Sequence, residues 1–365
     1  MTNPAKVALL GTGLIGGSIG LGLRRSGLLV RGYDHDPIRR DAALASGALD
    51  DVSDSVAGAV EGVDVAVVAV PVGRIAGLVI EARDAGAPVV TDVGSVKATV
   101  VTEVESARPD AAARFVGGHP MTGSEQSGLE GADAGLFAGT TWVLTPTGHT
   151  DASAFAAVGA LVGRLGSEVV ATTPDRHDEL VAVVSHVPQL AATTLMDVAA
   201  MTGEEHATLL RLAAGGFRDM TRIAASNTDI WPDICLANRE AIVAGLDDYL
   251  AALDEVRSLV ADSDRNGLLS VLERARDARR NLPVGAPSGE ALGEVRVPVP
   301  DRPGVIAEVT TLAGTLGVNI ADVEVAHSVE GGGGVLVLVV GARHAERLVE
   351  ALGARGYHAG WSELP

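Results

Sequence analysis

The chain has 365 residues, 47% hydrophobic and 21% charged, so it is long enough for about two or three domains that each bury a core. Its 47 acidic residues outnumber 28 basic ones, and the net charge of -19 argues against nucleic acid and anionic membrane surfaces as partners. An anionic substrate would therefore need a local cationic group. The single cysteine, Cys235, excludes an intramolecular disulfide framework and fits a reducing cytoplasm.

The first element is a strand followed by a glycine-rich turn. Residues Val7–Leu10 predict a buried strand, and the run Gly-Thr-Gly-Leu-Ile-Gly at 11–16 predicts a tight turn into a helix. In that context Gly11 permits the turn, Gly13 lets the backbone approach a pyrophosphate, and Gly16 permits close helix packing. The phosphates would lie at the helix N-terminus, so this segment predicts a dinucleotide site.

The second strand, Val30–Tyr33, ends at an acidic residue. Asp34 lies where a carboxylate accepts hydrogen bonds from the ribose hydroxyls and repels a 2′-phosphate, which favours NAD over NADP. Arg39 and Arg40 leave open the alternative that NADP is the cofactor, because two arginines could offset the effect of Asp34 on its 2′-phosphate. The cofactor-binding residues expected from this loop and the strand ends beyond it are Gly11, Gly13, Leu14, Ile15, Gly16, Asp34, Val70, Pro71, Asp92 and Ser95.

Continuous apolar strands recur along the first half of the chain, separated by alanine-rich helical stretches. This alternation predicts a doubly wound, Rossmann-type parallel sheet covered on both faces, over residues 1–172. The further expected strands are Val63–Val70, Val89–Thr91, Phe115–Gly117, Trp142–Thr145 and Glu168–Ala171.

Two loops of this domain carry candidate catalytic side chains. Ser95 follows the Val89–Thr91 strand and His119 follows the next, so both should open on the crevice at the carboxyl ends of the strands. A histidine there can accept a proton while the cofactor accepts a hydride, and a nearby hydroxyl can orient its ring. Alone, Ser95 is typical of a helix cap and His119 of a loop histidine bonded to backbone. Together they indicate a dehydrogenase.

A change of pattern at Thr173-Pro-Asp predicts a capped helix and an all-helical domain over residues 173–282. Within it, His186 and Gln189 lie one turn apart, and Arg222 offers a fork-shaped guanidinium for a carboxylate. The alternatives are a packed core histidine and a surface pair of Arg222 with Asp219.

A linker at 283–292 leads to a small C-terminal domain, residues 293–365. Its order of elements is β-α-β-β-α-β, which is ferredoxin-like. The turn Asp301–Gly304 opens the first helix, whose free amide groups can hold an amino-acid carboxylate.

Taken together, these motifs resemble the prephenate dehydrogenase family over residues 1 to about 281. The segments that carry the resemblance are Gly-Thr-Gly-Leu-Ile-Gly-Gly-Ser, Asp-Val-Gly-Ser-Val-Lys, Gly-Gly-His-Pro-Met-Thr-Gly-Ser-Glu, Ser-His-Val-Pro and Gly-Gly-Phe-Arg-Asp-Met-Thr-Arg-Ile-Ala. The resemblance implies NAD-dependent oxidative decarboxylation of prephenate to 4-hydroxyphenylpyruvate, with His119 as proton acceptor oriented by Ser95 and Arg222 on a substrate carboxylate. The other implied substrate-binding residues are Glu125, Ser185, His186, Gln189, Asp219 and Trp231.

The C-terminal domain resembles an ACT domain, and the resemblance implies tyrosine as effector at Asp301, Gly304 and Asn319, or a domain that only stabilises an oligomer. We also expect a homodimer, no metal and a cytoplasmic location.

Gln189 departs from a common family form, in which a second histidine stands there. Glutamine cannot become cationic, so arogenate stays open as the substrate. The remaining alternatives are another β-hydroxy acid dehydrogenase and a nucleotide-binding sensor without turnover. Enzymes of the first kind usually place a catalytic lysine in this helical region. No lysine stands between Pro174 and Asn281, which argues against that class.

Overall fold

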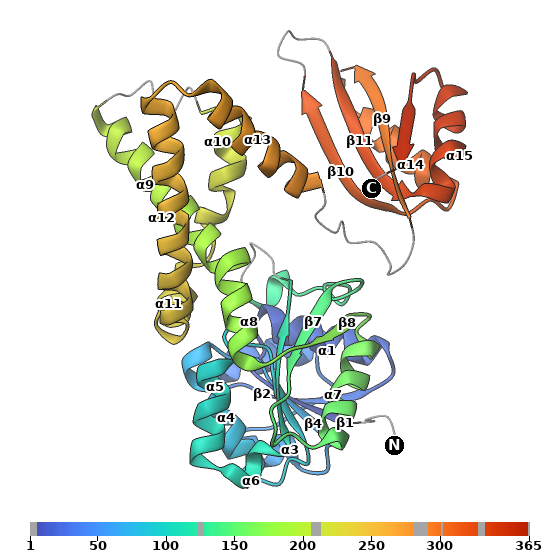
Figure 1. Cartoon of the computed structure of the whole chain (residues 1–365). Coiled ribbons are helices and arrows are strands. Elements are labelled where there is room, and N and C mark those ends of the chain that lie inside the picture. Colours follow the sequence, from blue (N-terminus) through green and yellow to red (C-terminus); the bar gives the residue numbers. More distant parts are fainter. Residues whose placement is uncertain are drawn as a thin grey trace. The chain divides into compact units, whose positions relative to one another are not determined.

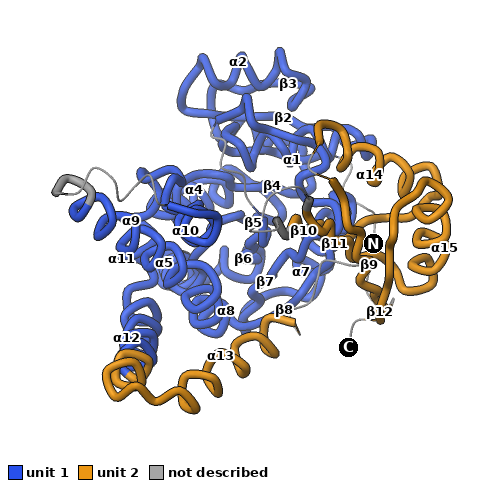
Figure 2. Tube along the Cα trace, turned by 90° about the horizontal axis from the view of Figure 1, so that it is seen from above, with its two compact units in different colours: residues 1–254 blue, residues 255–365 orange. Residues whose placement is uncertain are grey.

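The computed structural model describes residues 6–122, 128–205, 213–280, 291–300, 302–327 and 333–363. The chain forms two compact units, residues 1–254 and 255–365, coloured separately in Figure 2. The domain boundaries expected near residues 172, 282 and 292 stay predictions.

An eight-stranded sheet lies at the centre of the first unit, in the order β3-β2-β1-β4-β5-β6-β7-β8 (Figure 1). The reversal of strand order beside β1 creates the crevice in which such sheets bind ligands. Every pairing is parallel except β6 with β7. The strands are β1 (Lys6–Leu10), β2 (Leu29–Tyr33), β3 (Asp51–Val52), β4 (Val65–Val68), β5 (Val90–Asp92), β6 (Phe115–Pro120), β7 (Thr141–Thr145) and β8 (Glu168–Ala171).

Helices cover both faces of this sheet, which confirms the doubly wound prediction. Successive side chains of a strand point to opposite faces, so Val7 and Leu9 enter one core with α1 and α7, while Ala8 and Leu10 enter the other with α3, α4 and α5. The helices are α1 (Leu14–Arg25), α2 (Pro37–Ala45), α3 (Val56–Val60), α4 (Val72–Asp84), α5 (Ala98–Ala107), α6 (Pro109–Ala112) and α7 (Ala152–Arg164).

Two details of the sheet differ from the expectation. The strand β3 was not expected, because two residues carry no periodic signal. His119 lies within β6 rather than on the loop after it. The antiparallel return of β7 pairs His119 with Val143 and so extends the ladder beyond the parallel pairing of Thr91 with Val116.

The rest of the first unit is helical, as predicted. Thr173 caps α8, its hydroxyl accepting from the Arg176 N–H at 3.3 Å. One π-helical turn, Ala182–His186, interrupts what was expected to be a regular helix, and such turns are frequent at functional sites. The helices are α8 (Pro174–Val181), α9 (Val187–Glu205), α10 (Gly215–Thr221), α11 (Trp231–Ala237) and α12 (Arg239–Ala261), the last of which ends in the second unit.

The segment Pro174–Thr202 is long and apolar enough to cross a membrane by length and composition. It also contains the buried polar residues His177, Asp178, His186 and Gln189. The first part of this segment, α8, packs against α5 of the sheet domain, and its Asp178 bonds to the start of that helix.

The second unit contains helix α13 (Arg265–Arg280) and a four-stranded antiparallel sheet in the order β10-β11-β9-β12. Its order of elements confirms the β-α-β-β-α-β prediction. The core is formed by alternate residues of β9, such as Val295 and Val297, against both helices that cover the sheet. The elements are β9 (Leu292–Pro300), α14 (Val305–Thr315), β10 (Ile320–His327), β11 (Gly333–Gly341), α15 (Ala342–Gly353) and β12 (Gly360–Glu363).

Candidate active site

The glycine-rich turn has the shape that a pyrophosphate requires. Gly11 has φ +103°, and an added methyl group there would collide with the Ala69 carbonyl, while one at Gly16 would collide with the Gly11 carbonyl. At Gly13 such a group would meet nothing within 4 Å. Gly13 also precedes α1 with no side-chain cap, so the amide groups of the first turn face an open approach.

The Asp34 carboxylate is held in place by three hydrogen bonds. Its carboxylate accepts from the N–H and hydroxyl of Thr12 at 2.9 and 3.0 Å and from the Asp36 N–H at 3.0 Å. Burial raises the pKa of Asp34, but these hydrogen bonds outweigh it, so the pKa is lowered and the carboxylate stays ionised at neutral pH.

The surroundings of Asp34 fit an adenosine group. A cavity of about 350 Å³ is lined by Gly11, Tyr33, Asp34, His35, Val70, Arg74, Gly77, Leu78 and Glu81. The two arginines considered for NADP have other neighbours: Arg39 lies 3.6 Å from Asp36, and Arg40 donates to the Ser53 carbonyl at 3.2 Å. The residues present therefore fit NAD, whose nicotinamide end would follow the turn toward β5 and β6.

A second cavity, of about 430 Å³, brings the nucleotide loop and the candidate catalytic residues together. It is lined by Gly13, Leu14, Ile15, Ala69, Val70, Pro71, Val72, Val93, Gly94, Ser95, His119, Pro120, Thr122, Gly128, Ser226, Asn227, Ile230, Trp231, Asp233 and Ile234. Ser95 and His119 thus face the same space as the amide groups that would hold the cofactor.

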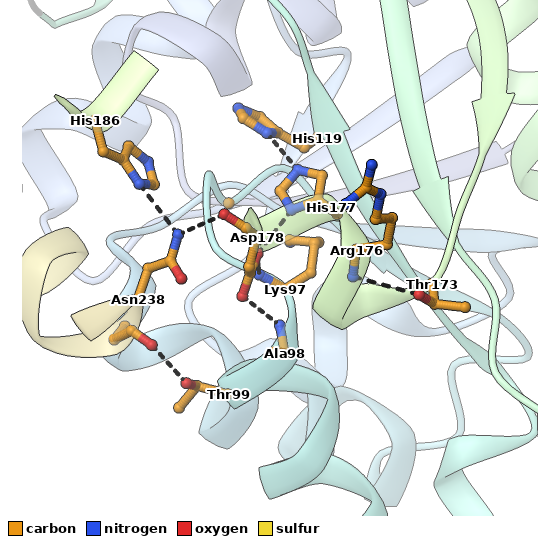
Figure 3. Close-up of polar contacts among 12 residues, drawn as sticks. Lys97, Ala98, Thr99, His119, Thr173, Arg176, His177, Asp178, His186 and Asn238 are labelled. Carbon is orange, nitrogen blue, oxygen red and sulfur yellow. Dashed lines mark hydrogen bonds and ion pairs between the residues drawn. The ribbon is translucent and has the colours of Figure 1, made fainter. Parts of the chain in front are cut away.

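The polar partner of His119 is another histidine, not the expected Ser95. His119 Nδ1 lies 2.8 Å from His177 Nε2, and His177 Nδ1 lies 2.7 Å from Asp178 Oδ1 (Figure 3). Burial and, to a smaller degree, the nearby Lys97 ammonium lower the pKa of His119 well below its usual 6.5. The ring is therefore neutral at physiological pH and available as a base.

A fully buried ion pair supports the backbone at His119 from behind. The Lys97 ammonium contacts the Asp92 carboxylate and donates to the Gly118 carbonyl at 3.0 Å. Asp92 also accepts from the Gly94 and Gly118 N–H groups at 2.8 and 3.1 Å. Asp92 was expected to bind the cofactor, but its carboxylate is fully buried and points inward, because these partners hold it.

His186 is also buried rather than open to the cavity. Its Nδ1 lies 3.2 Å from Asn238 Nδ2, which also donates to the Asp178 carbonyl at 2.9 Å (Figure 3). Its ring meets Trp231 edge to face at 6.0 Å. Burial lowers the pKa of His186 to about 4, so this histidine is neutral and supports Trp231 from behind.

Gln189 is linked to the cavity by a hydrogen bond to Ser226. Ser226 Oγ accepts from Gln189 Nε2 at 2.9 Å and from Trp231 Nε1 at 3.0 Å. A hydroxyl has two acceptor positions and one proton, so the proton of Ser226 is left to donate elsewhere. Ser226 lines the cavity beside Trp231 and is therefore a donor to whatever enters.

Other expected substrate-binding residues lie outside this lining. Arg222 and Asp219 are exposed, Arg222 on a 3-10 turn directly before Ser226 and Asp219 on α10. Ser185 is half-buried in the π-helical turn, and Glu125 lies outside the described residues.

Of the three expected effector residues, one lines a cavity of the second unit. Gly304, with φ +88°, precedes α14 and lines a cavity of about 770 Å³ in the second unit, together with Arg302, Ile306 and Thr310. Asn319 is exposed beyond that lining, and Asp301 lies outside the described residues.

Sequence reasoning missed His177, Asp178, Lys97, Asn238 and Ser226. One signal was available in α8. His177 and Asp178 stand one turn before the buried pair Val181 and Ala182, so ionisable residues occupy the apolar stripe of a helix. Such placement is a sign of a buried network.

Comparison with known proteins gives consistent results along the chain. The family model for the prephenate dehydrogenase nucleotide-binding domain matches residues 19–171, that for its dimerization domain matches 173–274, and that for the ACT domain matches 294–356. A prephenate dehydrogenase of Bacillus subtilis is 33% identical, with 94% of this chain and 95% of the relative covered.

Solved structures agree. A prephenate dehydrogenase from A. aeolicus, in complex with hydroxyphenyl propionate and NAD+, has a TM-score of 0.72 and 30% identity, covering 78% of this chain and 99% of that one. An arogenate dehydrogenase from Synechocystis has a TM-score of 0.65 and 28% identity, covering 75% of this chain and 98% of that one.

Proposed function

The chain belongs to the prephenate dehydrogenase family and is an NAD-dependent oxidoreductase, and we propose that it converts prephenate to 4-hydroxyphenylpyruvate on the route to tyrosine. The observation that carries this proposal is the shared cavity. In it, a neutral histidine base faces the same space as the glycine turn that fits the cofactor's pyrophosphate.

His119 takes the ring hydroxyl proton in this reaction. Bound NAD supplies the acceptor for the hydride that leaves the carbon bearing this hydroxyl. As that carbon becomes a carbonyl, the hydroxyl proton passes to His119. Loss of CO2 then moves the electron pair of the broken C–C bond into the ring, and the carbonyl oxygen takes a proton back to become a phenol. The protein therefore has to position the ring and hold one proton between two steps.

Prephenate suits this cavity better than arogenate does. The two substrates differ in one side-chain group: a keto oxygen accepts hydrogen bonds, and an ammonium only donates them. Since Gln189 and Trp231 both donate to Ser226, the Ser226 hydroxyl offers a proton, which suits the keto oxygen.

Parallel initial-rate assays test the proposed reaction and its substrate. With NAD saturating, we expect a clearly higher kcat/KM for prephenate than for arogenate. Protein carrying His119→Asn, purified in the same way, measures any contaminating activity. A preference for arogenate would overturn the choice of substrate, and turnover of neither would overturn the reaction.

Arg222 is the proposed anchor for a substrate carboxylate. Among the described residues that line the cavity there is no lysine or arginine, and Asp233 adds a negative charge. A dianionic substrate needs a cation there. Arg222 begins the 3-10 turn that ends directly before Ser226, a residue of the lining, and its guanidinium can pair with a carboxylate through two parallel hydrogen bonds.

Replacing Arg222 by alanine is therefore expected to raise the KM for prephenate by about 10-fold or more, with a smaller effect on kcat. Steady-state kinetics measure both constants. Arg218→Ala, which removes an exposed arginine from α10, serves as the control and should leave KM unchanged. An unaltered affinity for prephenate in Arg222→Ala would refute the role.

We also propose that the protein is a cytoplasmic homodimer. The matched dimerization domain supports the dimer, and so do large apolar side chains that are exposed on its helices. These include Val183, Val184, Val198, Met201, Leu236, Val243 and Leu250. The lone cysteine fits a reducing compartment.

Tyrosine is the proposed feedback inhibitor, bound at the cavity beside α14. Gly304 leaves the first turn of α14 without a side-chain cap, so its amide groups are suited to an amino-acid carboxylate. Apolar residues of the lining, among them Val299, Val305 and Val325, suit an aromatic side chain.

The variant Ile306→Asp tests this regulation in the full chain. Ile306 lines the cavity and is half-exposed, so a carboxylate there should repel that of tyrosine without strain. We expect tyrosine inhibition to weaken by about 10-fold or more while kcat stays the same. Val323→Asp, equally exposed on β10 but outside the lining, should retain inhibition. Full tyrosine sensitivity in Ile306→Asp would contradict the proposed site.

A further inference from the structure

A series of hydrogen bonds leads to His119 from the buried carboxylate of Asp178. Asp178 Oδ1 accepts from the Lys97 N–H and Oδ2 from the Ala98 N–H, both at 2.8 Å, at the N-terminus of α5 (Figure 3). Backbone amides only donate, so both oxygens act as acceptors, and the positive end of the helix favours the anion.

This carboxylate determines which nitrogen of His177 carries the proton. His177 Nδ1 is 2.7 Å from Asp178 Oδ1 and must donate to it. In its neutral form His177 has one N–H, which this bond uses, so Nε2 is left as an acceptor. The side chain is 1% exposed, which leaves no solvent to compete for either nitrogen.

The same reasoning then applies to His119. Its Nδ1 is 2.8 Å from the His177 Nε2 acceptor and must therefore carry a proton, with the rings edge to face at 5.0 Å. The remaining nitrogen, His119 Nε2, is the acceptor. Asp178 thus sets the tautomer of a histidine that it does not touch.

We propose that His177 and Asp178 are positioning residues, which hold His119 in its Nδ1–H tautomer and so present the Nε2 lone pair to the substrate hydroxyl. The inference rests on the proposed function for the identity of that hydroxyl. When Nε2 takes the proton, the imidazolium keeps its Nδ1–H bond to His177 Nε2. No proton has to move from His119 to His177 or Asp178, because the carbonyl oxygen takes the proton back from His119 Nε2 after CO2 leaves.

The other charged and titratable groups near His119 make this restraint necessary. Burial and the Lys97 ammonium disfavour a positive charge on the ring, and Asp92 is paired with Lys97. A neutral His119 without a fixed partner could equally place its proton on Nε2, and that form cannot accept the hydroxyl proton there.

The first test is the tautomer itself in the unaltered full-length protein. Two-bond ¹H–¹⁵N spectra of protein with labelled histidine distinguish Nδ1–H from Nε2–H, and the His119→Asn protein identifies the His119 signals. We expect Nδ1–H for His119 and Nδ1–H for His177. Finding Nε2–H on His119 would overturn the proposal whether or not the enzyme turns over prephenate.

The second test uses variants and kinetics. His177→Leu removes the acceptor, and we expect kcat to fall by about 10- to 100-fold, with the KM for NAD and for prephenate within about twofold. His177→Gln, whose carbonyl can accept from His119 Nδ1–H, should recover part of kcat. The control is Glu179→Gln on the same helix, where Glu179 is exposed and pairs with Arg176.

A folded His177→Leu protein with normal kcat would overturn the proposal. So would a loss that His177→Gln does not relieve, since that would indicate packing alone. If the leucine variant does not fold, the tautomer measured in the unaltered protein decides. If prephenate is not turned over at all, the proposed function fails and the tautomer result still stands.

Discussion

Replacing His119 by asparagine is expected to lower kcat by about 100-fold or more, with the affinity for NAD nearly unchanged. Asparagine is smaller than histidine and can still form hydrogen bonds at the carboxyl end of β6, but it cannot take a proton. The loss should therefore fall on the chemical step. The glycine turn follows β1 and Asp34 follows β2, so the side chain at position 119 is not part of either segment and NAD affinity is expected to stay nearly the same.

Two measurements separate these effects: steady-state kcat with prephenate, and direct titration of the protein with NAD. His149→Asn is the matched control, because His149 is exposed after β7 and should leave both values unchanged. A kcat for His119→Asn within about threefold of the original would remove the assignment of His119 as the base. A large loss of NAD affinity would instead indicate that the carboxyl end of β6 had moved.

The order of elements could be predicted because the local signals agree with the fold. The apolar strands, the glycine turn and the Thr173 cap each indicate the element that formed. The two differences in the sheet arose where pairing between strands decides the outcome. Neither the two-residue β3 nor the antiparallel partner of β6 has a local pattern.

The site could be predicted only where a local sequence signal or a general rule of the fold places a residue. Ser95 and His119 follow from the rule that ligands bind at the carboxyl ends of parallel strands, and the two do share one cavity. The partner of His119 comes from α8, 58 residues further along the chain, and no local pattern links the two. Arg222, expected in the site, is not among the residues that line this cavity.

Lys97 is expected to contribute both to the stability of the sheet domain and to the position of β6, the strand that carries His119. Its side chain is fully buried, and burial lowers its pKa, while the contact with Asp92 opposes that change. A lone buried carboxylate is far costlier than a paired one. Lys97→Met keeps most of the length of the side chain but removes the ammonium, so that of the described contacts the Asp92 carboxylate keeps the Gly94 and Gly118 amides and the Gly118 carbonyl loses this donor.

We therefore expect Lys97→Met to lower the free energy of unfolding by about 3–5 kcal/mol, and kcat to fall with it because Gly118 adjoins His119. Urea unfolding followed by tryptophan fluorescence measures the first effect. Lys6→Met, on an exposed lysine of β1, should change stability by less than about 0.5 kcal/mol. Adding Asp92→Asn to Lys97→Met removes the unpaired charge and should restore part of the loss. A loss below about 1 kcal/mol in Lys97→Met, or no recovery in the double variant, would show that the ion pair does not stabilise this domain.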